Sequence, residues 1–215
     1  MFTGIVEEIG TVESVRKGSV SSFIRIRAEK VLENTKLGDS IAVNGVCLTV
    51  TDISDKCFQA DVMNETLSRS SLGSLSAGSH VDLERAMAAD GRFGGHIVSG
   101  HIDGTGTVTD IKKDGISVWY TISAPAGIMR YIVEKGSVAI DGISLTVAKV
   151  TDTSFSVSVI PHTAAQTILG SKRSGDIVNL ENDIIGKYIE KLMRPAEAPQ
   201  SSGGITMDFL MKNGF

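Results

Sequence analysis

The chain repeats a unit of almost one hundred residues. The segment Asn44–Val50 (Asn-Gly-Val-Cys-Leu-Thr-Val) returns 97 residues later as Asp141–Val147 (Asp-Gly-Ile-Ser-Leu-Thr-Val). The alignment then runs without a gap as far as Leu83-Glu84 and Leu180-Glu181. A repeat of this length predicts two copies of one folded unit. Two copies of one pocket in turn suggest that the chain holds two similar ligands.

The length of the chain agrees with this division. A chain of 215 residues can form two domains of about 100 residues each, and a domain of that size buries a core without disulfides. We expect an N-terminal domain over residues 1–96, a C-terminal domain over 97–183, and a C-terminal helix and tail over 184–215. Ala86–Gly95 loses the strand pattern and is the expected linker. Upstream, a weaker repeat aligns Thr3-Gly4 with Ser99-Gly100.

Charge and composition exclude several classes of protein. The net charge of −4 and the absence of basic runs argue against nucleic acid as a partner. No apolar stretch approaches the roughly 20 residues of a membrane span, and the first residues lack the pattern of a signal peptide. Cys47 and Cys57 are replaced by Ser144 and Ser154 in the second copy. A disulfide scaffold or zinc site is therefore not expected, and a reducing cytoplasm is the expected location.

Short β-branched segments alternate with turn residues through both copies. Many short strands at regular spacing predict an all-β chain that forms small antiparallel barrels or sandwiches. The expected strands are Ser19–Arg27, Ser40–Asn44, Val46–Ile53, Phe58–Met63, His80–Glu84, Ser117–Ser123, Ser137–Asp141, Ile143–Val150, Ser154–Ile160 and Asp176–Glu181. Short helices or turns are expected over Thr66–Leu72, Thr163–Leu169 and Ala126–Glu134.

The residues after the second copy predict a helix. Ile185, Tyr188, Ile189 and Leu192 form one apolar face at helical spacing. This face could pack within the chain or mediate self-association, and the sequence leaves both alternatives open. Pro195–Gly204 has the composition of a flexible linker, and Ile205–Phe215 is apolar enough to dock elsewhere.

The strand that follows each Asn-Gly or Asp-Gly turn has two different faces. Val46, Leu48 and Val50 alternate with Cys47, Thr49 and Thr51, and the second copy repeats this alternation. One face fits a hydrophobic core. The other presents a thiol or hydroxyl group followed by a threonine, which suits a planar polar heterocycle, although a solvated face would show the same pattern.

A second candidate region is the glycine-rich segment Gly94–Gly104. It holds His96 and His101, two of the four histidines in the chain. Glycines permit close approach of a ligand to the backbone, and a histidine can transfer protons near neutral pH. A metal site is a poor alternative, because no cluster of carboxylates or thiolates completes a ligand set. The segment gives no definite role for His96.

At these residues the chain resembles the riboflavin synthase family. The shared motifs are Met-Phe-Thr-Gly-Ile-Val at the start, Asn-Gly-x-Cys-Leu-Thr-Val, Gly-Gly-His-x-x-Ser-Gly-His-Ile, Ile-Asp-Gly-Ile-Ser-Leu-Thr-Val and Ile-Pro-His-Thr. The resemblance implies two six-stranded Greek-key β-barrels and a C-terminal helix that forms a homotrimer with sites between subunits. It also implies association with lumazine synthase. Each barrel binds one 6,7-dimethyl-8-ribityllumazine, so that two meet in one active site. One molecule gains a four-carbon unit and becomes riboflavin, the other leaves as a ribitylamino-pyrimidinedione, and no metal or redox cofactor is used.

The resemblance also assigns roles to individual residues. The implied catalytic residues are His101 as proton acceptor or relay, Cys47 and Ser144 as polarising or nucleophilic groups, Asp141 in proton transfer, and Phe2, which would order the N-terminal segment over a substrate. The implied N-barrel pocket comprises Gly4, Ile5, Val6, Cys47, Leu48, Thr49, Asp61, Val62, Met63, Asn64, Glu65 and Thr66. The implied C-barrel pocket comprises Gly100, His101, Ile102, Lys135, Ser144, Leu145, Thr146, Ser158, Val159, Ile160, Pro161, His162 and Thr163. Threonine hydroxyls and backbone amides would bind the pyrimidinedione edge, and Glu65 and Lys135 would hold ribityl hydroxyls.

The two copies differ at positions in the implied pockets. Cys47 is matched by Ser144, and Glu65 by His162. Unequal pockets are expected if one lumazine donates the four-carbon unit and the other accepts it. The alternatives are a non-enzymatic lumazine-binding antenna protein, whose members lose the Gly-Gly-His-x-x-Ser-Gly-His segment, and a flavin-binding reductase barrel. The sequence shows no nucleotide domain after either copy, and it retains the histidine segment.

Overall fold

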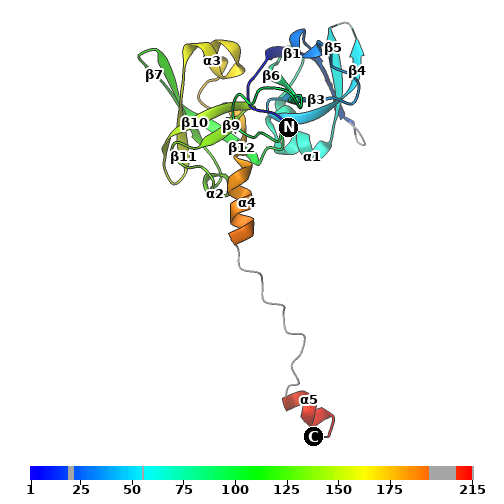
Figure 1. Ribbon diagram of the computed structural model, residues 1–215, viewed down its shortest axis with the longest axis vertical. Coiled ribbons are helices and arrows are strands. Elements are labelled where there is room, and N and C mark those ends of the chain that lie inside the picture. Colours follow the sequence, from blue (N-terminus) through cyan, green and yellow to red (C-terminus); the bar gives the residue numbers. More distant parts are fainter. Residues whose placement is uncertain (19–21, 55, 194–206, 215) are drawn as a thin grey trace.

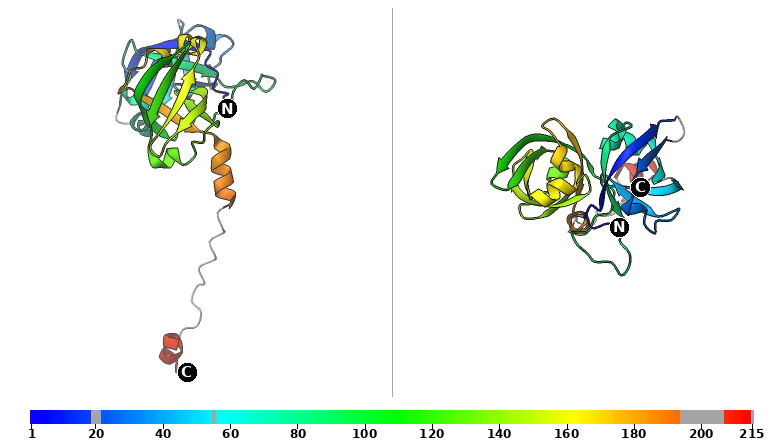
Figure 2. Two further views of the ribbon diagram at one scale, coloured as in Figure 1. Left: turned by 90° about the vertical axis from the view of Figure 1, so that its left-hand side faces the viewer. Right: turned by 90° about the horizontal axis from the view of Figure 1, so that it is seen from above.

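The protein consists mainly of two closed antiparallel β-barrels that lie side by side (Figures 1 and 2). The structure, a computed structural model, describes residues 1–18, 22–54, 56–193 and 207–214. The first barrel is formed by β1 (Glu8–Arg16), β2 (Ser22–Arg27), β3 (Ser40–Val43), β4 (Val46–Ser54), β5 (Cys57–Val62) and β6 (His80–Arg85). The second is formed by β7 (Gly104–Asp114), β8 (Ser117–Ser123), β9 (Ser137–Ile140), β10 (Ile143–Val150), β11 (Ser154–Val159) and β12 (Ile177–Asn182).

Both barrels have the same strand order. The first runs β1-β2-β5-β4-β3-β6, and the second runs β7-β8-β11-β10-β9-β12. In each, the second strand pairs with the fifth rather than with the third, which is the crossover of a Greek key. The prediction of two six-stranded Greek-key barrels is confirmed.

The sequence patterns missed one strand in each barrel, and the two missed strands are equivalents. β1 and β7 contain glycine at matching positions, Gly10 and Gly106. A Cβ atom at Gly10 would lie 2.5 Å from Leu83 Cδ1, and one at Gly106 would lie 2.7 Å from Leu180 Cδ1. A glycine inside a strand weakens the alternating pattern in the sequence, yet here it lets the first strand pack against the last and close the barrel.

Short helices cover parts of each barrel. The helical segments expected near residues 66–72 and 163–169 are each an α-helix followed by a 3₁₀ turn. They are α1 (Asn64–Arg69) with η2 (Ser71–Ser74), and α3 (Pro161–Gln166) with η3 (Ile168–Ser171). The helix expected over residues 126–134 is shorter, α2 (Ala126–Met129), because the chain turns toward β9 after one helical turn. A further 3₁₀ turn, η1 (Lys30–Leu32), lies between β2 and β3.

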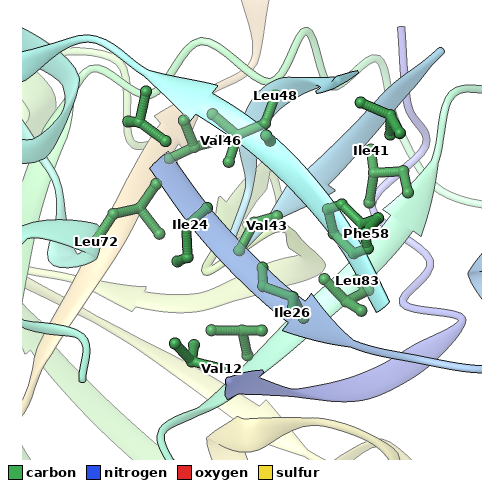
Figure 3. Close-up of a cluster of buried hydrophobic side chains, with 14 of the residues drawn as sticks. Val12, Ile24, Ile26, Ile41, Val43, Val46, Leu48, Phe58, Leu72 and Leu83 are labelled. Atoms are coloured by element: carbon green, nitrogen blue, oxygen red, sulfur yellow. The ribbon is translucent and has the colours of Figure 1, made fainter. Parts of the chain in front are cut away.

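Each barrel has its own hydrophobic core. Figure 3 shows the first, in which side chains from β1 to β6 meet inside the barrel. Val46, Leu48 and Val50 are buried there, whereas Thr49 and Thr51 on the other face of β4 are exposed. This confirms the alternation that the sequence predicts for β4 and leaves its second face available.

The two barrels meet at the turns that the repeat places at Asn44-Gly45 and Asp141-Gly142. The backbone N–H of Asp82 donates to Asn44 Oδ1, and that of Asn179 donates to Asp141 Oδ1, each at 2.8 Å. The side chains of Asp82 and Asn179 in turn form hydrogen bonds across the interface. Asp82 Oδ1 accepts from the N–H of Ile168 at 2.9 Å, and Asn179 Oδ1 accepts from the N–H of Ser71 at 2.7 Å.

The matched pair Asp82 and Asn179 differs in charge. Asp82 is 2% exposed, and its Oδ2 atom has no hydrogen-bond partner among the described residues. Asn179 Nδ2 in the equivalent place donates to the carbonyl of Asn44 at 2.8 Å. Burial raises the pKa of Asp82 well above its usual value, and nearby Asp141 adds to this. Lys172, which lies 2.9 Å from Asp141 Oδ2, offsets part of the charge.

We expect Asp82→Asn to stabilise the protein by about 1–2 kcal/mol near pH 8, because it removes a buried charge and keeps the acceptor for Ile168. The raised pKa means that the folded state binds more protons than the unfolded state above about pH 4. Wild-type stability therefore falls as the pH rises through the folded pKa. The gain should vanish near pH 4, as measured by urea unfolding at several pH values. Asn179→Asp is the matched control and should destabilise; a loss of stability in Asp82→Asn at pH 8 would contradict the assignment.

Within the described part of the chain, the C-terminal helix α4 (Ile184–Met193) has an uncovered apolar face. Ile185, Tyr188, Ile189 and Leu192 are 51–81% exposed. The helix is instead held through its polar side: Lys187 pairs with Asp103 at 2.6 Å, and Glu190 contacts Arg130 and Tyr131. Of the two alternatives that the sequence left open, packing of this face within the chain is therefore not seen among the described residues. The expected linker 195–204 lies outside the described residues, and a short helix, α5 (Met207–Lys212), forms within the tail.

Candidate functional site

Two extended segments cross between the barrels. We call residues 1–5 the N-terminal strap and residues 96–101 the central strap. They pair with each other through Phe2 and Val98, whose backbone groups exchange hydrogen bonds of 2.7 and 3.2 Å. The central strap follows residues 86–95, which contain no helix or strand and project as a loop (Figure 2).

Each strap ends on the strand of one barrel that carries the candidate thiol or hydroxyl group. The N–H of Ser144 on β10 donates to the carbonyl of Gly4, and the N–H of Cys47 on β4 donates to the carbonyl of Gly100, each at 2.8 Å. A Cβ atom at either glycine would lie 2.6 Å from the Cβ atom of its partner, Ser144 or Cys47. Both glycines also have positive φ, +75° and +82°, so no other residue fits these contacts without strain.

This arrangement corrects the expected division of the pocket residues. The segment Gly4–Val6 was expected in the N-barrel pocket, but Gly4 lies against Ser144 and Val6 packs on the core of the second barrel. The segment Gly100–Ile102 was expected in the C-barrel pocket, but it lies beside Cys47 and Ile102 packs on the core of the first barrel. The sequence does not predict that each strap lies on the far barrel. The N-terminal strap directly precedes the first barrel in the chain but contacts the second, and the central strap directly precedes the second barrel but contacts the first.

The N-barrel pocket is a cavity of about 280 Å³ beside Cys47. Its walls come from β4, α1 and the central strap, and they are lined by Val46, Cys47, Met63, Glu65, Thr66, Arg69, Gly100, His101 and Ile102. Glu65 and Arg69 form an exposed ion pair at 3.2 Å on its rim. The structure thus brings Cys47 and His101 to one cavity, together with polar groups able to bind hydroxyls.

The equivalent site on the second barrel pairs Ser144 with a different histidine. His96 Nδ1 lies 2.7 Å from Ser144 Oγ, and the N–H of His96 is bonded to the carbonyl of Thr3. Burial lowers the pKa of His96, although Asp183 and Glu181 oppose this effect, so the neutral ring is favoured. A neutral imidazole at this distance can accept the serine proton. The sequence pattern predicted no role for His96, since this residue precedes the aligned part of the repeat and only folding brings it to Ser144.

Phe2 and Asp141 occupy buried positions between the barrels. Phe2 is fully buried with Val98, Ala42 and Ala139, and these contacts fix the N-terminal strap. Phe2 does not line the 280 Å³ cavity. Asp141 is 1% exposed, and its carboxylate is bound by Lys172 and the N–H of Asn179. The resemblance implied a role for it in proton transfer. These contacts instead suit a residue that fixes the turn before Ser144.

The remaining expected pocket residues divide by burial. Leu48, Val62 and Val159 are buried, while Leu145 is partly buried. The exposed or half-buried residues are Ile5, Thr49, Asp61, Asn64, Lys135, Thr146, Ser158, Ile160, Pro161, His162 and Thr163. Lys135 lies in the turn before β9 with φ of +66°, and its N–H donates to the carbonyl of Val147.

Two larger hollows lack the candidate chemistry. One of about 540 Å³ lies around Glu33–Thr35 and the start of the segment after β6, and one of about 460 Å³ lies between α2 and α4. Neither is lined by Cys47, Ser144 or the two strap histidines. Within the described residues, no group of three or more His, Cys, Asp or Glu side chains is placed to hold a metal ion. None of the helices in this part of the chain has the length and apolar character needed to cross a membrane.

Two equivalent barrels, each with a strap on a thiol- or hydroxyl-bearing strand, define a duplicated small-molecule-binding protein. Residues 3–86 and 99–183 each match the family model of the lumazine-binding domain. Riboflavin synthase of Actinobacillus pleuropneumoniae is 58% identical over 217 residues, and riboflavin synthase of Bacillus subtilis (strain 168) is 47% identical over 215; both matches cover all of both chains. The chain belongs to the riboflavin synthase family of lumazine-binding proteins.

Solved structures agree with this assignment. LumP complexed with riboflavin superimposes with a TM-score of 0.79 at 26% identity, and LumP complexed with 6,7-dimethyl-8-(1'-D-ribityl) lumazine with 0.76 at 25%. Both matches cover 85% of this chain and 99% of LumP. The antenna alternative is not favoured, since the full-length relatives at 47–58% identity carry the name of the enzyme.

Proposed function

We propose that the protein is a transferase that converts two molecules of 6,7-dimethyl-8-ribityllumazine into riboflavin and 5-amino-6-(ribitylamino)pyrimidine-2,4-dione. The single observation that carries this proposal is the full-length identity of 58% to a riboflavin synthase. The duplicated pockets support it, because a reaction between two copies of one molecule requires two similar sites. Much of the rate can come from holding the two heterocycles in a fixed orientation.

The chemistry that we assign to the pockets is proton transfer and polarisation. The C7 methyl group of the lumazine is acidic, because its anion delocalises into the ring system, so a modest base suffices. His101 beside Cys47 would accept or relay this proton in the N-barrel pocket. Ser144, bonded to His96, would polarise the second lumazine or add to it. The Nε2 atom of His96 is buried and has no hydrogen bond to other described residues.

The binding residues follow the corrected division. We propose that one lumazine contacts Gly100–Ile102, Cys47–Thr49 and 61–66, and that the other contacts Gly4–Val6, Ser144–Thr146, 158–163 and Lys135. Glu65 in the first pocket and Lys135 in the second would hold ribityl hydroxyls. Phe2 and Asp141 act as positioning residues, because their buried contacts place the straps and the Ser144 turn.

We propose three units with boundaries at residues 1–96, 97–183 and 184–215, in which the last forms a homotrimer. The uncovered apolar face of α4 supports self-association, since four large apolar side chains on one helix are costly to leave in water. The active sites would then form between subunits, from the N-barrel pocket of one copy and the C-barrel pocket of another. A cytoplasmic location and association with lumazine synthase belong to the same proposal.

Incubation of the pure protein with the lumazine alone tests the proposed reaction. We expect riboflavin to appear with one pyrimidinedione for each riboflavin and two lumazines consumed, without added metal or redox cofactor. Chromatography with absorbance detection measures all three compounds. Binding with fluorescence and no turnover would instead support the antenna protein, and no binding would overturn both functions.

A further inference from the structure

Two buried glutamates hold the straps through matching sets of hydrogen bonds. Glu84, at the end of β6, accepts from the N–H of Thr3 at 2.8 Å, from Thr3 Oγ1 at 3.0 Å and from the N–H of Gly4 at 3.0 Å. Glu181, at the end of β12, accepts from the N–H of Ser99 at 2.6 Å, from Ser99 Oγ at 2.7 Å and from the N–H of Gly100 at 3.0 Å. Both carboxylates are nearly inaccessible to solvent.

Each glutamate acts on the pocket of the other barrel. Glu84 belongs to the first barrel, but the strap that it holds ends with the Gly4 carbonyl on Ser144 of the second. Glu181 belongs to the second barrel, but its strap ends with the Gly100 carbonyl on Cys47 of the first. In both cases the glutamate accepts from the N–H of a strap glycine, and the carbonyl of that same glycine accepts from the pocket strand. One glycine therefore links each glutamate to the pocket strand of the other barrel.

The contacts leave little freedom in this link. The glycine Cα of each strap is held so close to the pocket strand that an added Cβ would overlap it. Hydrogen bonds to an ionised carboxylate are stronger than neutral ones. A displaced carboxylate would therefore move the Gly100 carbonyl from Cys47, and with it the adjacent His101 that lines the 280 Å³ cavity.

We propose that Glu84 and Glu181 are crosswise positioning residues: Glu181 of the second barrel sets the N-barrel pocket at Cys47 and His101, and Glu84 of the first barrel sets the C-barrel pocket at Ser144. The consequence for turnover rests on the proposed function. The crosswise link itself does not rest on the proposed function, because the rate at which a thiol in the pocket reacts with an alkylating reagent reports the link directly.

Alkylation of Cys47 by iodoacetamide in the full-length protein measures the link at the first pocket. Cys57 is buried, and peptide mass spectrometry separates the two thiols. Glu181→Gln keeps the size of the side chain but replaces one acceptor oxygen by an NH₂ group that faces an N–H donor. We expect it to raise the alkylation rate of Cys47 by about tenfold, the factor that one charge-assisted hydrogen bond corresponds to. Glu84→Gln, the matched control, should change this rate by less than about twofold.

Exchanging the thiol tests the reverse direction. In the double variant Cys47→Ser/Ser144→Cys, the reactive thiol reports the second pocket. There we expect Glu84→Gln to raise alkylation by about tenfold and Glu181→Gln to leave it nearly unchanged. Circular dichroism and thermal midpoints would confirm that the variants fold. If a glutamine variant does not fold, Thr3→Ala removes one hydrogen bond to Glu84, and Ser99→Ala removes one to Glu181 together with the bond that Ser99 Oγ accepts from the N–H of His101. Both should show the same crossing with smaller effects.

Two outcomes would overturn the proposal: each glutamate affecting the thiol of its own barrel, or both variants affecting both thiols equally. Glu181→Asp keeps the charge on a shorter side chain. We therefore expect its alkylation rate at Cys47 to lie between those of the wild type and Glu181→Gln. Failure of the wild type to form riboflavin would sink the proposed function and leave the crossed alkylation pattern intact.

Discussion

His101→Ala is expected to reduce kcat for riboflavin formation by about 10²–10⁴-fold, the usual contribution of general acid–base catalysis by one side chain. The exposed imidazole lines the same cavity as Cys47, so its loss removes a proton acceptor but little binding surface. The Kd of the lumazine should therefore change by no more than about threefold, since a group that acts in the transition state lowers kcat more than affinity. Steady-state kinetics and fluorescence titration measure the two quantities.

His80→Ala is the matched control for this prediction. His80 is exposed at the start of β6 and bonds to Thr11, and it lines none of the cavities described above. It should retain wild-type turnover. A near-normal kcat in His101→Ala, or a parallel loss in His80→Ala, would remove His101 from the proposed mechanism. Cys47→Ala provides a second check at the same cavity and should likewise lower turnover more than binding.

His96→Ala is expected to lower kcat by about 10²-fold, because Ser144 Oγ loses the ring nitrogen that accepts its proton. Burial lowers the pKa of His96, so the ring stays neutral and competent until the pH falls below the ordinary histidine value of about 6.5. The wild type should therefore keep its activity through neutral pH and lose it on the acid side, where the ring gains a proton. A kcat–pH profile measures this limb.

The double variant His96→Ala/Ser144→Ala separates a catalytic pair from two independent effects. Residues that act as one unit are not additive, so the double variant should be about as slow as the slower single variant. Two results would show that the hydrogen bond only supports the structure. One is a double variant whose loss of kcat equals the product of the two single losses. The other is a His96→Ala variant whose kcat–pH profile is unchanged on the acid side.

The repeated motifs predicted most of the fold. The strands around Cys47 and Ser144 follow directly from alternation and from the turns before them, and the repeat implied that both copies fold alike. β1 and β7 escaped prediction for a tertiary reason. Gly10 and Gly106 look like breaks in a strand, and only the side chains of Leu83 and Leu180 on the opposite strand explain why glycine is required.

The candidate site was predicted in composition but not in arrangement. Cys47, Ser144 and His101 are recognisable by motif. The partner of Ser144 is not, because His96 precedes the aligned segment and reaches Ser144 only through the central strap. Asp141 was implied in proton transfer, but the contact between the barrels buries it beside Lys172. Such contacts join residues of different units, and the pattern within one unit carries no information about them.

By itself the sequence determined that this protein has two similar all-β units, each with a pocket strand, and that the two pockets differ at Cys47 and Ser144. Strand period and turn residues act locally, so they can be read along the chain. Only the tertiary structure decided which strap covers which pocket. Gly4 lies on Ser144 and Gly100 on Cys47 because the two straps pair with each other through Phe2 and Val98 at the contact between the barrels. That pairing joins residues 96 positions apart in the chain, so no local sequence pattern predicts it.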